Sequence, residues 1–287
     1  MAIKKNKTIG DSSAKQSSSS NFSTRGLLGK FLVLVTPFLF LLVWYIVAAG
    51  TTPLILPSPV DVLIRLVSYF ANGRIFPHLF MTTQEILAGF VLGGVLGLGF
   101  GTLISESEIA RKLIMPYIIV TQALPKFALA PMLVIWFGFG MAPKIIIAAL
   151  IAFFPLVENT YMGLTSTPKS QLELFRALRA SRLTTLLKLR VPHAVPAIFS
   201  GFRVALMLSL VGAVVAEYVG ANQGLGALII VSQGTLDTEL MFVSFVILTA
   251  LGLCLDWLYG IVYKIVLRKL YGNTADDISS STTRLSV

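Results

Sequence analysis

The sequence predicts an all-α polytopic membrane protein, because its composition and its long apolar segments are both typical of that class. Of its 287 residues, 55% are hydrophobic and only 13% are charged, and the mean hydropathy is +0.83. A soluble domain carries about a quarter charged residues. Apolar segments in lipid form helices, since every backbone amide must find its partner within the protein. An ordinary soluble enzyme, a disordered protein and a disulfide-linked scaffold are excluded, the last because Cys254 is the single cysteine.

Six segments are apolar enough to cross a membrane as helices. A helix rises about 1.5 Å per residue, so a hydrocarbon core of about 30 Å needs roughly 20 residues. The six predicted transmembrane helices are 31–49, 86–104, 113–137, 145–164, 197–219 and 240–262. Prolines interrupt the third segment, and single charged residues lie within the fifth and the sixth.

The distribution of positive charge predicts how these spans are oriented. The net charge is +10, and Lys and Arg collect at residues 1–30, 111–112, 165–196 and 264–284. The long loop on the opposite side holds only Arg65 and Arg74. The positive-inside rule places the cation-rich segments in the cytoplasm, which predicts that the N- and C-termini are both cytoplasmic. The charge therefore reflects membrane orientation, and no nucleic-acid partner is expected.

These features divide the chain into three parts. We expect a disordered basic cytoplasmic tail at 1–30, a transmembrane domain at 31–271 with a cytoplasmic segment at 165–196, and a disordered cytoplasmic tail at 272–287. The tails cannot bury enough apolar surface to offset the entropy of ordering them. In the outer loop, a helix start at Pro59 and the spacing of Val62, Leu66 and Phe70 predict a short amphipathic helix at the membrane surface.

A stripe of glycines predicts close helix packing along the second span. Gly89, Gly93, Gly97 and Gly101 recur every four residues, so they lie on one helix face. Small residues allow a neighbouring backbone to approach closely. We interpret the stripe as packing within one subunit, with a pore lining or a dimer seam as the alternative.

Pro125 and Lys126 lie near the centre of the third predicted span. A charge at that depth costs at least about 2.5 kcal/mol on insertion scales, so it normally faces a cavity or a partner. Lys126 is thus a candidate for the solute pathway, and the alternative is a span broken at Pro125 with Lys126 reaching toward water. Glu217 and Asp256 present the same choice more weakly, because both lie close enough to a membrane boundary to be solvated.

The cytoplasmic segment 165–196 has the pattern of two short helices joined by a turn. One apolar stripe contains Leu172, Phe175 and Leu178, and a second stripe begins at Leu183. The helical phase changes between them, which predicts a turn near 179–181 and an N-cap at Ser181. A basic helix pair with an apolar face suits docking to a soluble partner, with binding to anionic lipid as the alternative.

The same segment resembles the cytoplasmic loop motif of binding-protein-dependent ABC importer permeases. That motif opens with Glu-Ala-Ala, has a Gly four residues after the second Ala and ends near a Pro. Glu173, Ala180, Ser181 and Pro192 fit it, whereas Leu174 and Phe175 replace the two alanines and Arg179 replaces the glycine. Arginine at the position of that glycine is sterically unfavourable if the turn needs positive φ.

Other stretches resemble the nitrate, sulfonate and taurine branch of these importers. They include Pro125 with Pro131, the run 134–140, the run 152–155, 201–203, and Ala216-Glu217 with Gly224-Leu225-Gly226. The run 124–131 is most similar to members assigned to pyrimidine precursors, riboflavin or aromatic acids. The resemblance covers about 54–271, nearly the whole membrane region.

The resemblance implies a type I ABC importer permease in a bacterial inner membrane. Two copies would form the pathway, two ATPase subunits would bind ATP and Mg below it, and an extracytoplasmic binding protein would deliver the solute. This chain would need no cofactor and would catalyse no reaction. The residues expected to couple to the ATPase are Glu173, Phe175, Arg176, Ala177, Leu178, Arg179, Ala180, Ser181 and Pro192. Phe175 and Leu178 would anchor the contact, and Pro192 would end the element.

The solute is left open at this stage, as is the class of transporter. A pyrimidine precursor, riboflavin or an aromatic acid competes with a sulfonate- or nitrate-type anion. A stand-alone secondary transporter is the main rival, although neither internal repeats nor several midplane carboxylates are visible in the sequence. A membrane enzyme is a weaker rival, because His78 and His193 are predicted to lie on opposite sides of the bilayer.

Overall fold

The computed structural model describes residues 21–271, with side chains over 35–270, and all regular structure within that range is helical. It contains two compact units, residues 1–60 and 61–287. Helix α1, Asn21–Ala49, belongs to the first unit. The turn that follows α1 is fixed by Trp44, whose indole Nε1 donates to the Pro57 carbonyl at 3.1 Å. Residues 1–20 and 272–287 of the predicted disordered tails lie outside the described residues, whereas residues 21–30 form the start of α1, contrary to the predicted disorder.

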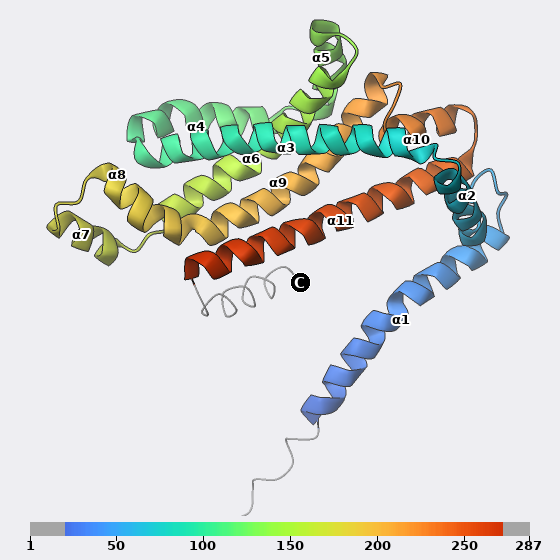
Figure 1. Cartoon of the computed structure of the whole chain (residues 1–287), viewed down its shortest axis with the longest axis horizontal. Helices are drawn as coiled ribbons and strands as arrows, with labels where there is room; N and C mark the ends of the chain where they lie inside the picture. The colour runs from blue at the N-terminus through green and yellow to red at the C-terminus, as the bar shows by residue number, and fades with distance from the viewer. Residues whose placement is uncertain (1–20, 272–287) are drawn as a thin grey trace, which may run out of the picture. The chain divides into compact units, whose positions relative to one another are not determined.

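The second unit is a bundle of long helices joined by short turns and short helices (Figure 1). Its elements are α2 Pro59–Ala71, α3 Ile75–Glu106, α4 Glu108–Ala123, η1 Lys126–Ala128, α5 Leu129–Phe137, α6 Met141–Thr165, α7 Lys169–Ala177, α8 Arg182–Thr185, η2 Leu186–Arg190, α9 Val191–Gly220, α10 Leu225–Gly234 and α11 Thr238–Tyr271. Helix α6 packs along both α3 and α9 and is the centre of the bundle. The predicted amphipathic outer helix is α2, which buries Val62.

Four described helices are long and apolar enough to cross a membrane. They are Ile75–Glu106, Met141–Thr165, Arg182–Gly220 and Thr238–Leu270. A fifth span is obtained if Glu108–Ala123 and Lys126–Phe137 count as one, although they meet at an angle of 79°. The described apolar part of the first predicted span, Val35–Ala49, is shorter. All six predicted apolar segments therefore lie in helices, and the structure shows four to five spans.

The glycine stripe on α3 packs against the backbone of α6. All four glycines are buried. A Cβ at Gly93 would lie 2.6 Å from the Ala149 carbonyl oxygen, and one at Gly97 would lie 2.5 Å from Leu156 Cβ. The interpretation as packing within one subunit is confirmed, because helices this close leave no room for a side chain at those positions.

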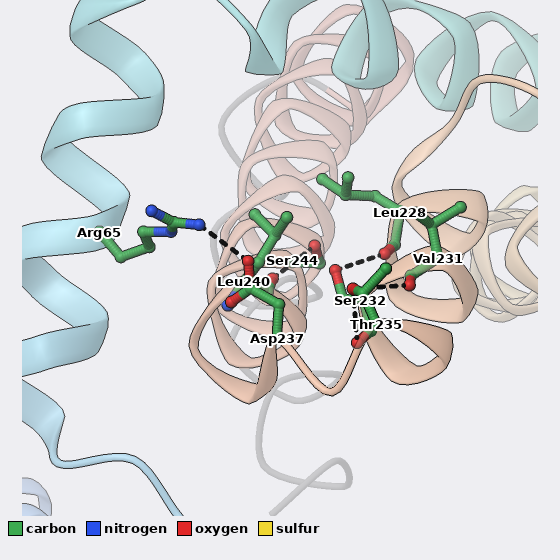
Figure 2. Close-up of polar contacts among 8 residues, drawn as sticks. All are labelled: Arg65, Leu228, Val231, Ser232, Thr235, Asp237, Leu240 and Ser244. Atoms are coloured by element: carbon green, nitrogen blue, oxygen red, sulfur yellow. Dashed lines mark hydrogen bonds and ion pairs between the residues drawn. The ribbon is translucent and has the colours of Figure 1, made fainter. Parts of the chain in front are cut away.

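The connection 221–237 joins the fifth and sixth predicted spans. It contains the short helix α10, whose first half is buried. Asp237 then caps α11, since its Oδ1 accepts the Leu240 amide at 3.1 Å. Its Oδ2 accepts from Arg65 of α2 at 2.8 Å (Figure 2). One carboxylate therefore ends the α10–α11 turn and holds α2 against it.

We predict that Gly93→Ala destabilises the bundle by about 1–3 kcal/mol, because the added methyl group clashes with backbone that cannot move away. The matched control is Gly99→Ala on the same helix, where an added Cβ meets nothing within 4 Å. That control should be neutral or slightly stabilising, since Ala favours helix over Gly. Thermal unfolding of the purified chain in detergent measures both, and equal melting temperatures for the two variants would contradict the packing assignment.

Candidate functional site

The segment between α6 and α9 forms a helical hairpin, α7–α8, that projects from one end of the bundle (Figure 1). Arg179 has a φ of +52°, the left-handed conformation that normally favours glycine. The Ala180 amide donates to the Phe175 carbonyl at 3.0 Å, and the Arg179 amide donates to the Arg176 carbonyl at 2.9 Å. These two bonds are those of a Schellman motif, which satisfies the last carbonyls of a helix.

The start of α8 is capped as the sequence predicted. Ser181 lies in extended backbone, and its Oγ accepts the Thr184 amide at 3.1 Å. The predicted turn at 179–181 and the predicted N-cap are therefore confirmed. Arg179 therefore adopts the positive φ that is expected of the glycine at this position of the loop motif.

The surface of the α7–α8 hairpin combines exposed leucines with exposed cations. The leucines with more than half of their surface exposed are Leu174, Leu178, Leu183 and Leu187. Phe175 and Leu172, two members of the predicted stripe, are half-buried. Glu173, Arg176 and Ala177 of α7 are exposed, as are Arg179 and Ser181, whereas Ala180 is half-buried. On the first helix the exposed apolar residues are thus Leu174 and Leu178, of which only Leu178 belongs to the predicted stripe, whereas Leu183 of the second predicted stripe is exposed as expected.

Pro192 does not end the element, contrary to the prediction. It lies in the first turn of α9, directly after a π-helical turn. Helices α8, η2 and α9 together form one apolar helix, Arg182–Gly220. A π-helical turn, Leu186–Arg190, precedes the proline within it. At this turn Arg190 donates to Glu106, at the end of α3, at 2.5 Å.

A cavity of about 530 Å³ opens where the third predicted span breaks. Pro125 lies at the break in extended backbone, and α4 and η1–α5 diverge by 79° there. The cavity's polar lining residues are Gln122, Lys126, Glu158 and Asn159. Aromatic walls come from Phe127 and Phe154, and α9 contributes Val204 and Leu208. The span is thus broken at Pro125, and Lys126 lines the cavity at the break.

Lys126 is held against an aromatic ring inside this cavity. Its Nζ lies 4.2 Å from the centroid of the Phe154 ring, a cation–π contact. Asn159 Nδ2 donates to the Pro155 carbonyl one turn earlier on α6, at 2.8 Å, which fixes the amide at the cavity wall. The sequence reasoning missed Glu158 and Asn159 as site residues. Their spacing from Phe154 and Pro155, four residues in each case, would have placed them on the same face of α6.

Glu217 lies elsewhere and does not line this cavity. It is 1% exposed, so the idea that it is solvated is wrong. Its Oε1 accepts from the Thr82 hydroxyl at 2.6 Å, and its Oε2 accepts the Gly226 amide at 2.5 Å. A Cβ at Gly224 would lie 2.2 Å from Glu217 Oε1, so only glycine fits there. Glu217 therefore fixes the turn between α9 and α10, together with Thr82 of α3.

Two further ion pairs neutralise charges inside the spans. Lys144 Nζ lies 2.7 Å from Glu85 Oε1, and both side chains are almost fully buried. Arg203 makes two hydrogen bonds to Asp256, at 2.7 and 2.8 Å, and links α9 to α11. Asp256 is thus ion-paired, which the sequence reasoning did not foresee. Among the described residues, no group of His, Cys, Asp and Glu could hold a metal ion.

Residues 89–268 match the family described as "Binding-protein-dependent transport system inner membrane component", so the chain belongs to that family. Among its relatives is a "Probable ABC transporter permease protein" of Haemophilus influenzae, 40% identical over 76% of this chain and 91% of that protein. The riboflavin transport system permease protein RibX of Chloroflexus aurantiacus is 34% identical, with 82% of this chain and 88% of that protein covered.

The formylaminopyrimidine transport permease protein ThiX of Halalkalibacterium halodurans is also 34% identical, over 70% of this chain and 80% of that protein. In structure, the chain is similar to the MetNI methionine ABC transporter in an inward-facing conformation. The TM-score is 0.57 at 18% identity, with 67% of this chain and 94% of that chain covered. This similarity shows the type I ABC permease fold.

The chain is therefore the non-catalytic permease subunit of an ABC importer, a multi-pass protein of the inner membrane. Membership of the family implies ATPase and binding-protein partners. The resemblance inferred from the sequence is confirmed at this level. The stand-alone secondary transporter finds no support in these comparisons.

We predict that Glu85→Ala destabilises the fold by about 3–5 kcal/mol, because it leaves the Lys144 ammonium buried without its partner. The double variant Glu85→Ala/Lys144→Ala should recover part of that loss, since it removes both charges. Glu108→Ala is the matched control, because Glu108 pairs with Lys112 at the exposed start of α4 and should contribute less than about 1 kcal/mol. Thermal unfolding distinguishes these cases, and a single variant no worse than the control would contradict the buried pair.

We also predict that Arg179→Gly strengthens the hairpin turn by about 1 kcal/mol, since glycine adopts positive φ without steric conflict. Arg179→Val should weaken the turn, because a β-branched residue is disfavoured there. Hydrogen exchange of the Ala180 amide reports this directly, as that amide donates across the turn. If the Ala180 amide of the glycine variant exchanges faster than that of the unmodified chain, the positive φ does not strain Arg179.

Proposed function

We propose that the α7–α8 hairpin of this permease docks into its ATPase partner and transmits ATP-driven motion to the pathway. The observation that carries the proposal is the set of four exposed leucines, Leu174, Leu178, Leu183 and Leu187, on a basic hairpin whose turn is fixed by a Schellman motif and an N-cap. Burying one leucine side chain contributes about 1.5–3 kcal/mol, so these anchors suit a groove on a protein. The arginines of the hairpin would orient the contact.

The connection from the hairpin to the pathway supports transmission of that motion. Helices α8, η2 and α9 form the continuous helix Arg182–Gly220, and Val204 and Leu208 of this helix line the cavity. A displacement of the hairpin would therefore move one wall of the cavity. The π-helical turn Leu186–Arg190 is the natural place for a small change in angle, because such turns have weaker regular bonding. Rocking of rigid helices is a standard route for switching access between two sides.

The cavity beside Pro125 and Lys126 is the part of the pathway that we assign to this chain. Glu217, the third pathway candidate, is not included in this proposal, because the α9–α10 turn uses both of its oxygens. ATP and Mg would bind to the ATPase partner, and this chain would hold no cofactor of its own. An extracytoplasmic binding protein would deliver the solute.

We further propose six spans, both termini in the cytoplasm and a second copy of the chain beside the first. The first span would be α1, and the third would be the bent pair α4 and η1–α5. A second copy would cover part of the apolar surface around the break, where Ile135 and Phe139 are each 79% exposed. Lipid would cover the remaining apolar surface. The solute would be a pyrimidine precursor, riboflavin or an aromatic acid, or else a sulfonate- or nitrate-type anion.

We predict that Leu178→Asp abolishes uptake and releases the ATPase while leaving membrane insertion intact, because a charge cannot enter an apolar groove. Gln171→Asp adds the same charge at another exposed position of α7 and is the matched control. Co-purification of the ATPase and solute uptake in cells are the two measurements. Normal uptake in the Leu178 variant would refute docking through this hairpin.

A further inference from the structure

Two pairs of opposite charges inside the spans neutralise each other. Lys144 pairs with Glu85, and Arg203 pairs with Asp256. Lys126 and Glu158 belong to none of the described ion pairs, and both line the same cavity. Charges within a bilayer are normally paired or exposed to a pathway. The cavity is therefore the place where this chain leaves charge available to a ligand.

The structure provides this cavity with a definite arrangement of groups. A volume of about 530 Å³ falls within the range of small-molecule sites. The Lys126 ammonium lies 4.2 Å from the centroid of the Phe154 ring, a cation–π contact that favours this position. On α6, Glu158 follows Phe154 by one turn, and it adds a carboxylate to the same wall. The amides of Gln122 and Asn159 complete the polar lining.

We propose that this cavity binds the transported solute, and that the solute is a small flat heteroaromatic molecule with both an acceptor or anionic group and N–H donors. The inference rests on the proposed function, because it takes the cavity as part of the pathway. The Lys126 ammonium would donate to the acceptor group, and the Glu158 carboxylate would accept from the N–H donors. Phe127, which is 56% exposed, presents a ring against which a flat solute can pack.

The same groups argue against an aliphatic sulfonate. A sulfonate carries a negative charge and no N–H donor, so Lys126 would attract it and Glu158 would repel it. Its short chain would also leave the aromatic walls without a flat partner. Specificity of this kind comes from an unfavourable group as much as from a favourable one. Glu158 is thus the residue that we assign to solute selection, and Lys126 is the residue that we assign to affinity.

The test measures solute binding to the full chain reconstituted in lipid nanodiscs, without ATPase or binding protein. The probes are riboflavin, followed by its own fluorescence, and a radiolabelled formylaminopyrimidine, with ethanesulfonate as the comparison. We expect at least one heteroaromatic probe to bind saturably and ethanesulfonate to bind much more weakly. Lys126→Met should lower the binding affinity for the heteroaromatic probe by roughly 10- to 100-fold, because it removes a charge-assisted hydrogen bond.

Glu158→Gln gives the sharpest comparison. This variant should lower the affinity for the heteroaromatic probe by about tenfold, because an acceptor for its N–H donors is lost. It should raise the affinity for ethanesulfonate, because the repelling charge is gone. The matched controls are Lys112→Met and Glu108→Gln, which remove the same charges from the exposed first turn of α4. Binding in these controls should equal that of the unmodified chain.

A second measurement locates the site even if a charge variant fails to fold. Cys254 is the single cysteine, so Cys254→Ser supplies a background for Val204→Cys at the cavity wall. A water-soluble maleimide should label this cysteine, and the bound heteroaromatic probe should slow the labelling. An unchanged rate of labelling at a saturating probe concentration would show that the probe does not bind in this cavity.

The class of solute is wrong if neither heteroaromatic probe binds, or if ethanesulfonate binds as tightly to the unmodified chain. The assignment of the site is wrong if Lys126→Met and Glu158→Gln both bind like the controls. None of these outcomes depends on the hairpin. Failure of the proposed function would be seen separately, as normal uptake by the Leu178→Asp variant.

Discussion

The constraint on which this structure depends is that a charge or an unpaired backbone group cannot remain unsatisfied in an apolar interior. Lys144 and Glu85 neutralise each other with their atoms 2.7 Å apart, and Arg203 and Asp256 do so through two hydrogen bonds. Glu217 satisfies the Gly226 amide where the backbone leaves α9. Each contact joins different helices, so meeting the electrostatic requirement also fixes how the helices are arranged.

The two ends of α9 differ in how they are connected to the rest of the bundle. At one end the helix continues through a π-helical turn into the exposed α7–α8 hairpin. At the other end it is tied to α3 and α10 through Glu217 and Thr82, by hydrogen bonds of 2.5 to 2.8 Å. The hairpin end is tied to α3 only through Arg190 and Glu106 among the described ion pairs, and the hairpin beyond it is exposed, so a displacement of the hairpin can be transmitted along α9. The cavity lies between these ends, beside Val204 and Leu208.

The elements that the sequence anticipated depend on neighbours close in the chain. The turn at 179–181 followed from a change of helical phase, and the Ser181 cap followed from local hydrogen bonding. The glycine stripe was recognised because a helix brings every fourth residue to one face, and Gly93 indeed meets Ala149. Helix α10 was missed, since its ten residues are too few to read as a span. Pro192 was misinterpreted, because the helix Arg182–Gly220 continues through it after a π-helical turn.

By itself, the sequence determined that the chain is a helical membrane protein, where its apolar segments lie and which segment forms the basic hairpin. These features follow from composition and short-range periodicity. Only the tertiary structure decided that Glu85 meets Lys144, 59 positions away, and that Glu158 shares a cavity with Lys126. Partners so distant in the chain are brought together by helix packing, and no local pattern encodes which faces will meet. The chemistry available to a solute was therefore visible only in the folded chain.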